Sequence, residues 1–189
     1  MKKITNEILG DESQIKSRDR VKDQGEVYTR PQEVDAMLDL VVDYVNDVNK
    51  TFLEPAVGQG VFLHRLLDRR LKSIVNNNPI PPHSREDVDK LFLTSLFTLY
   101  GVDIMEDNVK DTRRNLLDIF RLNYPVNFKE DGDYVFRKAK EIVGLNIILG
   151  NTLKPEDVLI YEWSYNNRRL IKQQPVTLKF MIDGQTTIA

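Results

Sequence analysis

Apolar residues recur at helical spacing along much of the chain. Between Val34 and Val45 they stand three and four positions apart, which predicts an amphipathic helix with its N-cap at Thr29. The same spacing predicts further helices over residues 61–75, 85–96, 106–122 and 134–144. Each of these helices has an apolar face and therefore needs a second element to pack against.

Short apolar runs between these helices predict β-strands. The expected strands cover residues 51–53, 97–104, 145–153, 157–165 and 175–182. Strands that alternate with helices are typical of an α/β domain, in which a mostly parallel sheet is flanked by helices.

The chain is expected to form a polar N-terminal arm over residues 1–24 and a single domain over residues 25–189. The arm mixes charges of both signs, which is typical of a solvated segment; a flap that closes over a ligand is the alternative. The sequence "NNNPIPPHS" predicts a surface loop. Together with the helix after it, this loop forms an insertion at about 76–95.

Composition narrows the function classes. The 189 residues are 41% hydrophobic and 30% charged, which suits one globular domain, and the net charge of -2 gives no overall basic field for nucleic acid. There are no cysteines, and the two histidines, His64 and His83, lie apart, so no metal site is expected. The chain has neither a membrane-spanning run of about 20 apolar residues nor a secretory signal, so a cytoplasmic protein is expected.

The stretch "TFLEPAVGQGVFLHRLL" contains a candidate ligand-binding turn between the first strand and its helix. Gly58 and Gly60 allow positive φ and let a ligand approach the main chain closely. The turn fits neither the dinucleotide pattern G-x-G-x-x-G nor a P-loop. Glu54 stands just before the turn, where an acid would repel a phosphate and favour a cationic or hydroxyl-bearing ligand.

Polar residues also stand at the ends of the next two strands. Asp103 ends the second strand and Asn151 follows the apolar part of the third. Ligands of open α/β sheets bind beyond the carboxyl ends of the strands. Helix caps or loop acids would explain any one of these residues, but they explain less well why Glu54, Asp103 and Asn151 all occupy this edge.

Four segments together resemble the S-adenosylmethionine-dependent DNA methyltransferases that modify adenine N6. They are "GEVYTRPQEVDAMLDLV", "FLEPAVGQGVFL", "LYGVDIMEDNV" and "IILGNTL", which follow the family's order over residues 25–153. The resemblance implies a Rossmann-like methyltransferase fold with S-adenosylmethionine as cofactor. Because the chain leaves few strands for the usual seven, this fold is expected to be incomplete at its C-terminal end.

The resemblance also implies roles for individual residues. Glu54 would meet the methionine amino group, Asp103 the ribose hydroxyls and Asn151 the adenine amino group, while Ile104 would pack on the adenine. Tyr28 and Thr29 would close over the methionine end. The full set of expected cofactor-binding residues is Tyr28, Thr29, Glu54, Pro55, Ala56, Gly58, Gly60, Phe62, Asp103, Ile104, Asn151 and Leu153.

The chain departs from the family pattern in four places, one of which is Val57 in place of a common cysteine. Arg30 interrupts the usual Thr-Pro, and Asn151 replaces the usual aspartate. The catalytic tetrapeptide [NDS]-P-P-[YFW] is missing, and the matching position reads "YEWSYNN". There, Glu162 could accept a hydrogen bond from an amino group and Trp163 or Tyr165 could stack on a flipped base; packing of both aromatic rings against the sheet is the alternative.

Two functions follow as expectations. One is methyl transfer to adenine N6 in DNA, within a restriction-modification or phage system, where a partner or specificity subunit supplies DNA recognition and the missing catalytic loop. The other is a cofactor-binding, non-catalytic subunit or regulator. A dehydrogenase-type dinucleotide domain is disfavoured by Glu54 before the turn and by the absent third glycine.

Overall fold

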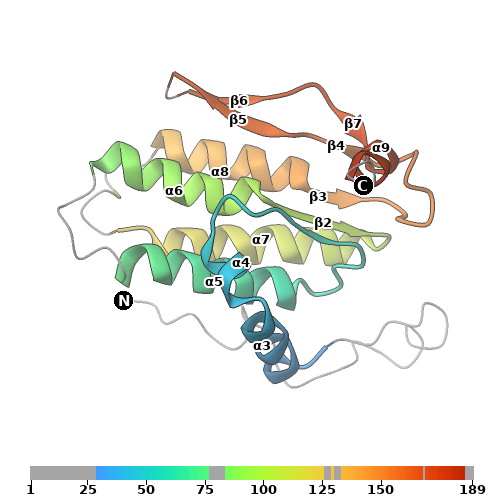
Figure 1. The fold of residues 1–189 in the computed structure, drawn as a ribbon, viewed down its shortest axis with the longest axis horizontal. Helices are drawn as coiled ribbons and strands as arrows, with labels where there is room; N and C mark the ends of the chain where they lie inside the picture. Colours follow the sequence, from blue (N-terminus) through green and yellow to red (C-terminus); the bar gives the residue numbers. More distant parts are fainter. Residues whose placement is uncertain (1–28, 77–83, 126–128, 130–132, 168, 186–189) are drawn as a thin grey trace.

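A parallel three-stranded sheet lies at the centre of the computed structural model, which describes residues 29–76, 84–125, 129, 133–167 and 169–185 (Figure 1). Its strands are β1 (Phe52–Glu54), β2 (Leu99–Asp103) and β3 (Ile147–Leu149), in the order β1-β2-β3. In this register Glu54 pairs with Gly101, and Asp103 pairs with Leu149. The carboxyl ends of all three strands therefore meet at one edge, as the sequence predicts. The mixed α/β class is confirmed.

Two helices make up each crossover between neighbouring strands. Helices α5 (Val61–Asn76) and α7 (Glu106–Asn123) lead away from β1 and β2. Helices α6 (Arg85–Phe97) and α8 (Asp133–Asn146) then run almost directly into β2 and β3. The four helices extend beyond the short strands, and α5 packs on α7 while α6 packs on α8 (Figure 1). Most of the hydrophobic core therefore lies between helices.

The first described helix is broken where the sequence predicts one continuous helix. Helix α3 (Pro31–Leu40) and helix α4 (Val42–Asn46) are separated by Val41, whose φ is -123°. The N-cap is Arg30 and not Thr29, because the Glu33 carboxylate accepts a hydrogen bond from the Arg30 N–H at 3.1 Å. The extra residue between threonine and proline thus serves as the cap, and Thr29 is left at the mouth of the pocket described below.

Arg70 anchors the connection between α4 and β1. Its guanidinium is completely buried and donates to the backbone carbonyls of Val45, Asp47 and Lys50 at 2.9, 3.0 and 2.8 Å. It also donates to Thr98 Oγ1 at 2.9 Å. Burial lowers the pKa of Arg70 to about 10, so the side chain stays charged at neutral pH. One side chain thereby fixes the segment that leads into β1.

In the C-terminal region, two of the predicted strands are wrong. The segment 157–165 forms two short strands, β4 (Leu159–Ile160) and β5 (Trp163–Asn166), and neither joins the parallel sheet. Instead, β4 pairs antiparallel with β7 (Val176–Thr177), and β5 pairs antiparallel with β6 (Arg169–Lys172). The segment 175–182 is mostly helical, because α9 (Leu178–Gln185) follows directly after β7.

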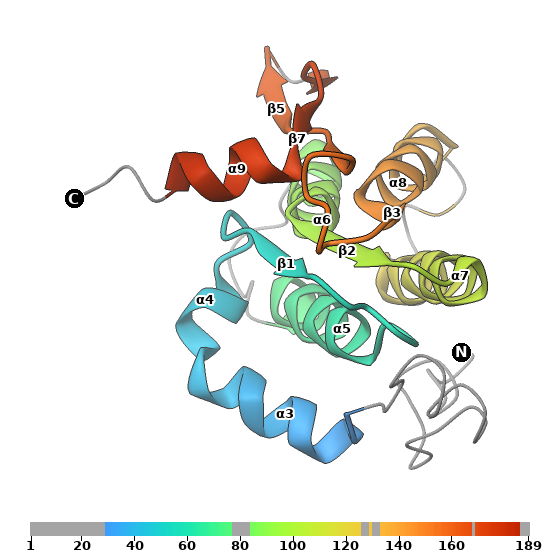
Figure 2. The same ribbon diagram turned by 90° about the vertical axis from the view of Figure 1, so that its right-hand side faces the viewer.

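These two segments do not extend the parallel sheet, because their apolar residues cover one of its faces. Val158, Ile160 and Leu178 are buried in a small cluster with Tyr100 and Val102 of β2. Figure 2 shows α9 beside β1 and β2, on the side of the sheet opposite α5. In the described ranges, no helix is both long and apolar enough to cross a bilayer.

Candidate functional site

A pocket of about 390 Å³ lies at the carboxyl ends of the three parallel strands. Most of the expected cofactor-binding residues line it: Thr29, Glu54, Pro55, Ala56, Gly58, Phe62, Asp103, Ile104, Asn151 and Leu153. Tyr28 lies outside the described residues, and Gly60 lies in the same loop but does not line the pocket. The volume of the pocket is within the usual range for small-molecule sites, about 300 to 1,000 Å³.

Two glycines set the path of the loop that follows β1. Gly58 has a φ of +51° and Gly60 has a φ of +78°. Residues other than glycine rarely adopt positive φ. A Cβ atom on Gly60 would lie 2.6 Å from both His64 Nε2 and Thr112 Oγ1. Gly60 is therefore needed to let the loop settle onto α5 and α7.

His64 is part of the floor beneath this loop. It is only 1% exposed. Its Nε2 lies 3.4 Å from the carbonyl oxygen of Thr112. The missing side chain at Gly60 creates the space that the imidazole fills. Among the described residues, no group of three or more histidine, aspartate or glutamate side chains is placed to hold a metal ion.

The Asp103 carboxylate connects the loop after β1 to the loop after β2 by hydrogen bonds. Its Oδ2 accepts a hydrogen bond from the Gly58 N–H at 2.7 Å. Its Oδ1 accepts from the Met105 N–H at 2.8 Å and from Asn108 Nδ2 at 3.3 Å. An ionised carboxylate has about four acceptor positions. One position is therefore left for a ligand.

Further hydrogen bonds join the three loops at the strand ends. The Val57 N–H donates to the Val102 carbonyl and the Gly150 N–H to the Asp103 carbonyl, both at 2.9 Å. Thr152 Oγ1 donates to the Pro55 carbonyl at 3.1 Å, so the loop after β3 is tied to the loop after β1. The walls of the pocket are therefore held in place by the protein itself.

Glu54 is the acidic group inside the pocket. It is half-buried, and burial raises its pKa from 4.5 to about 7. Within the described part of the chain, no cation or hydrogen-bond donor contacts its carboxylate. A carboxylate in this position is poorly solvated and lacks a partner, so it favours a ligand that brings a positive charge or a donor.

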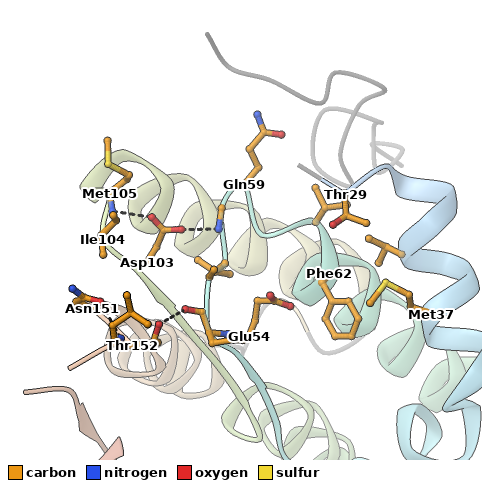
Figure 3. A pocket seen from close by; sticks show the side chains of 18 residues that line it. Thr29, Met37, Glu54, Gln59, Phe62, Asp103, Ile104, Met105, Asn151 and Thr152 are labelled. Carbon is orange, nitrogen blue, oxygen red and sulfur yellow. Dashed lines mark hydrogen bonds between the residues drawn. The ribbon is translucent and has the colours of Figure 1, made fainter. Parts of the chain in front are cut away.

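The pocket also contains uncovered apolar side chains. Ile104 and Leu153 keep 52% and 89% of their surfaces exposed, which leaves apolar area for a ligand to cover. Figure 3 shows Ile104, Met105 and Asn151 on one side of the pocket and Thr29, Met37 and Phe62 on the other. The pocket thus combines an acidic group with uncovered apolar surface.

Several lining residues are missing from the sequence-based set: Val34, Met37, Val57, Gln59, Val61, Met105, Gly150 and Thr152. Most of them directly follow or precede an expected residue, so their position in the sequence could have identified them as lining residues. Met37 lacked such a signal. Its place in an apolar helical face predicts a core residue, whereas it is 50% exposed and faces the pocket.

The three candidate catalytic residues lie away from the pocket. Trp163 is buried in β5, and its Nε1 donates to Asn146 Oδ1 at 2.9 Å. The Tyr165 ring packs against Phe97 with 6.0 Å between ring centroids, and burial raises its pKa. Glu162 precedes β5, and its backbone carbonyl accepts from the Gln173 N–H. None of the three lines the pocket. Trp163 contacts α8 and Tyr165 contacts α6, whereas the alternative expected both rings to pack against the sheet.

No protein-family model matches this chain, and neither does any curated protein or solved structure.

Proposed function

We propose that this chain is the S-adenosylmethionine-binding part of a DNA methyltransferase. The observation that carries the proposal is the half-buried carboxylate of Glu54, which has no partner among the described residues and shares a pocket with the exposed Ile104 and Leu153. Such a pocket suits a ligand with a cationic group at one end and a flat apolar ring at the other. S-adenosylmethionine has this distribution, with its methionine ammonium group and its adenine.

Each part of this ligand has a matching group in the pocket. The ammonium group would pair with Glu54, and Thr29 also lines the pocket. The ribose hydroxyls would donate to the remaining acceptor position of Asp103. The adenine would cover the exposed surfaces of Ile104 and Leu153 beside Asn151. Because the loops are already tied together, little ordering energy would oppose binding.

The reaction we propose is methyl transfer to adenine N6 in DNA, within a restriction-modification or phage system. S-adenosylmethionine would supply the activated methyl group, and the chain's own residues would bind and orient it. A partner chain would supply DNA recognition and the group that holds the target adenine. The four-segment resemblance supports this assignment, and the position of Glu162, Trp163 and Tyr165 away from the pocket supports the need for a partner.

The same position of these residues also favours a second candidate. If no partner completes the site, the chain would be a cofactor-binding subunit or regulator that transfers no methyl group. Both candidates require the cofactor to bind in the pocket beside Glu54. They differ only in whether a target base can be held next to it.

Calorimetric titration with S-adenosylmethionine tests the shared claim. The wild-type chain should bind one equivalent, and Glu54→Gln should weaken binding at pH 8 by about tenfold or more, because a charge-assisted contact is lost. Glu162→Gln is the matched control, since Glu162 is exposed and outside the pocket, and its affinity should equal that of the wild type. Absence of wild-type binding would overturn the proposal.

A methyl-transfer assay on unmodified DNA separates the two candidates. Transfer to adenine N6 that depends on an added partner chain would support the enzyme. Cofactor binding without transfer under any partner condition would select the non-catalytic subunit.

A further inference from the structure

The side chain of Asn151 is oriented by a backbone N–H two residues further along the chain. Its Oδ1 accepts a hydrogen bond from the Leu153 N–H at 3.0 Å. The reverse orientation would place the Nδ2 hydrogens against that same N–H, and two donors cannot pair. The amide nitrogen is therefore the part of the side chain that remains available, and no acceptor within the described ranges takes its hydrogens.

Asparagine and aspartate consequently present opposite groups at this position. An aspartate could accept from the Leu153 N–H with one oxygen and still offer the second oxygen to a ligand as an acceptor. Asn151 uses its single oxygen in the turn and offers N–H donors instead. The replacement of aspartate by asparagine therefore exchanges a hydrogen-bond acceptor for a donor, and it also changes the strength of the hydrogen bond.

The location of Asn151 gives this change a consequence for the ligand. It lines the pocket together with the exposed Ile104 and Leu153, whose apolar surfaces would cover a planar ring. Figure 3 shows Asn151 and Ile104 on the same side of the pocket. A side chain beside the edge of a ring can distinguish its donors from its acceptors. Mismatched polar groups are costly in a partly buried site, because one of them is left without a partner.

We infer that Asn151 donates a hydrogen bond to the base of the ligand, so that the atom of the base that faces Asn151 is an acceptor. This inference rests on the proposed function, since it takes the base to be the purine of an S-adenosylmethionine-type nucleoside. An adenine would be held through N7, the ring nitrogen beside the 6-substituent that is an acceptor in both adenine and 6-oxopurines, and its amino group would not be selected. The site should therefore tolerate a 6-oxopurine in place of adenine.

The test compares S-adenosylhomocysteine with its hypoxanthine analogue, in which an oxygen replaces the adenine amino group. Calorimetry gives the dissociation constants of both for the wild type, Asn151→Asp and Asn151→Ala. For the wild type, the hypoxanthine analogue should bind within about threefold of the adenine compound. In Asn151→Asp the preference for adenine should rise by about tenfold, because a carboxylate oxygen accepts from the amino group and repels the 6-oxygen. Asn151→Ala should fall between them.

The design separates this inference from the proposed function. The two ligands carry the same net charge, so the charge added by Asn151→Asp cancels in the ratio of their affinities. The introduced carboxylate keeps an oxygen for the Leu153 N–H, and the position is exposed, so the fold should be retained; melting curves verify this. An equal adenine preference in the wild type and Asn151→Asp would overturn the inference alone. Failure of the wild type to bind either compound would overturn the proposed function.

Discussion

Replacement of Glu54 by glutamine should stabilise the protein in a pH-dependent way. Burial raises the pKa of Glu54 to about 7 in the folded chain, against 4.5 for an ordinary glutamate. Below about pH 4.5 the carboxyl is protonated in both folded and unfolded chains, and nothing is lost. As pH rises from about 4.5 to about 7, the unfolded chain is ionised while the folded chain is still protonated, so the folded state loses free energy; above about pH 7 the loss is constant.

The size of this loss follows from the two pKa values. Their difference corresponds to at most about 3 kcal/mol. Because the side chain keeps some contact with water, about 2 kcal/mol is the better expectation. Glu54→Gln carries no charge and avoids this loss, so at pH 8 it should melt about 4 to 8 °C above the wild type, a shift typical for a chain of this size. At pH 5 most of the difference should vanish.

Thermal unfolding followed by circular dichroism at pH 5 and pH 8 measures both values. Glu162→Gln is the control, and its melting temperature should follow that of the wild type at each pH, because this carboxylate is exposed. If Glu54→Gln gained the same stability at both pH values, or none at pH 8, the assigned burial of an unpartnered carboxylate would be wrong.

Ligand binding should depend on pH in the opposite sense. A cationic ligand needs the ionised carboxylate, of which only about one tenth is present at pH 6 when the pKa is about 7. Wild-type affinity for S-adenosylmethionine should therefore rise by about tenfold between pH 6 and pH 8. Glu54→Gln should show no such rise.

Three other substitutions test the parts of the fold that shape the pocket. Asp103→Asn replaces an oxygen that accepts from an N–H by an NH₂ group, and it should lower the free energy of unfolding by about 2 kcal/mol in chemical denaturation. Gly60→Ala forces a side chain into positive φ and against His64; it should cost about 1 to 3 kcal/mol, and an unchanged melting temperature would contradict the loop geometry. Arg70→Met leaves several buried carbonyls without donors and should cost about 3 kcal/mol or more, whereas an equal stability in urea would show that this anchor is dispensable.

The sequence predicted the parts of the site that depend on short-range chemistry. A glycine pair after an apolar run is a local signal, and so are polar residues such as Glu54, Asp103 and Asn151 at the ends of strands. Parallel pairing then brings these ends together without further information. The lining residue Met37 could not be predicted in this way, because an apolar residue on a helical face gives the same pattern in a core as at a pocket wall.

The C-terminal region was harder to predict because its strands are short. With only two residues each, β4 and β7 carry too little periodicity to tell a strand from a cover segment. The sequence also could not show that Gly60 leaves room for His64 beneath the loop, since this depends on contact with Thr112, far along the chain. Such contacts are decided by packing and not by local pattern.

The packing of the β5–β6 hairpin bears on whether the chain can act alone. To bring Trp163 to a target base, the hairpin would have to leave its place against α8. That move would expose a buried indole and leave Asn146 Oδ1 without its donor inside the protein, while Asn146 Nδ2 still donates to the carbonyls of Phe97 and Leu99. Lost burial of about 2 to 3 kcal/mol and an unsatisfied buried acceptor of about 1 to 3 kcal/mol add to a few kcal/mol. A conformer at that cost would be populated well below one per cent. Under the proposed function, this favours a partner chain over a rearranged hairpin as the source of the missing group.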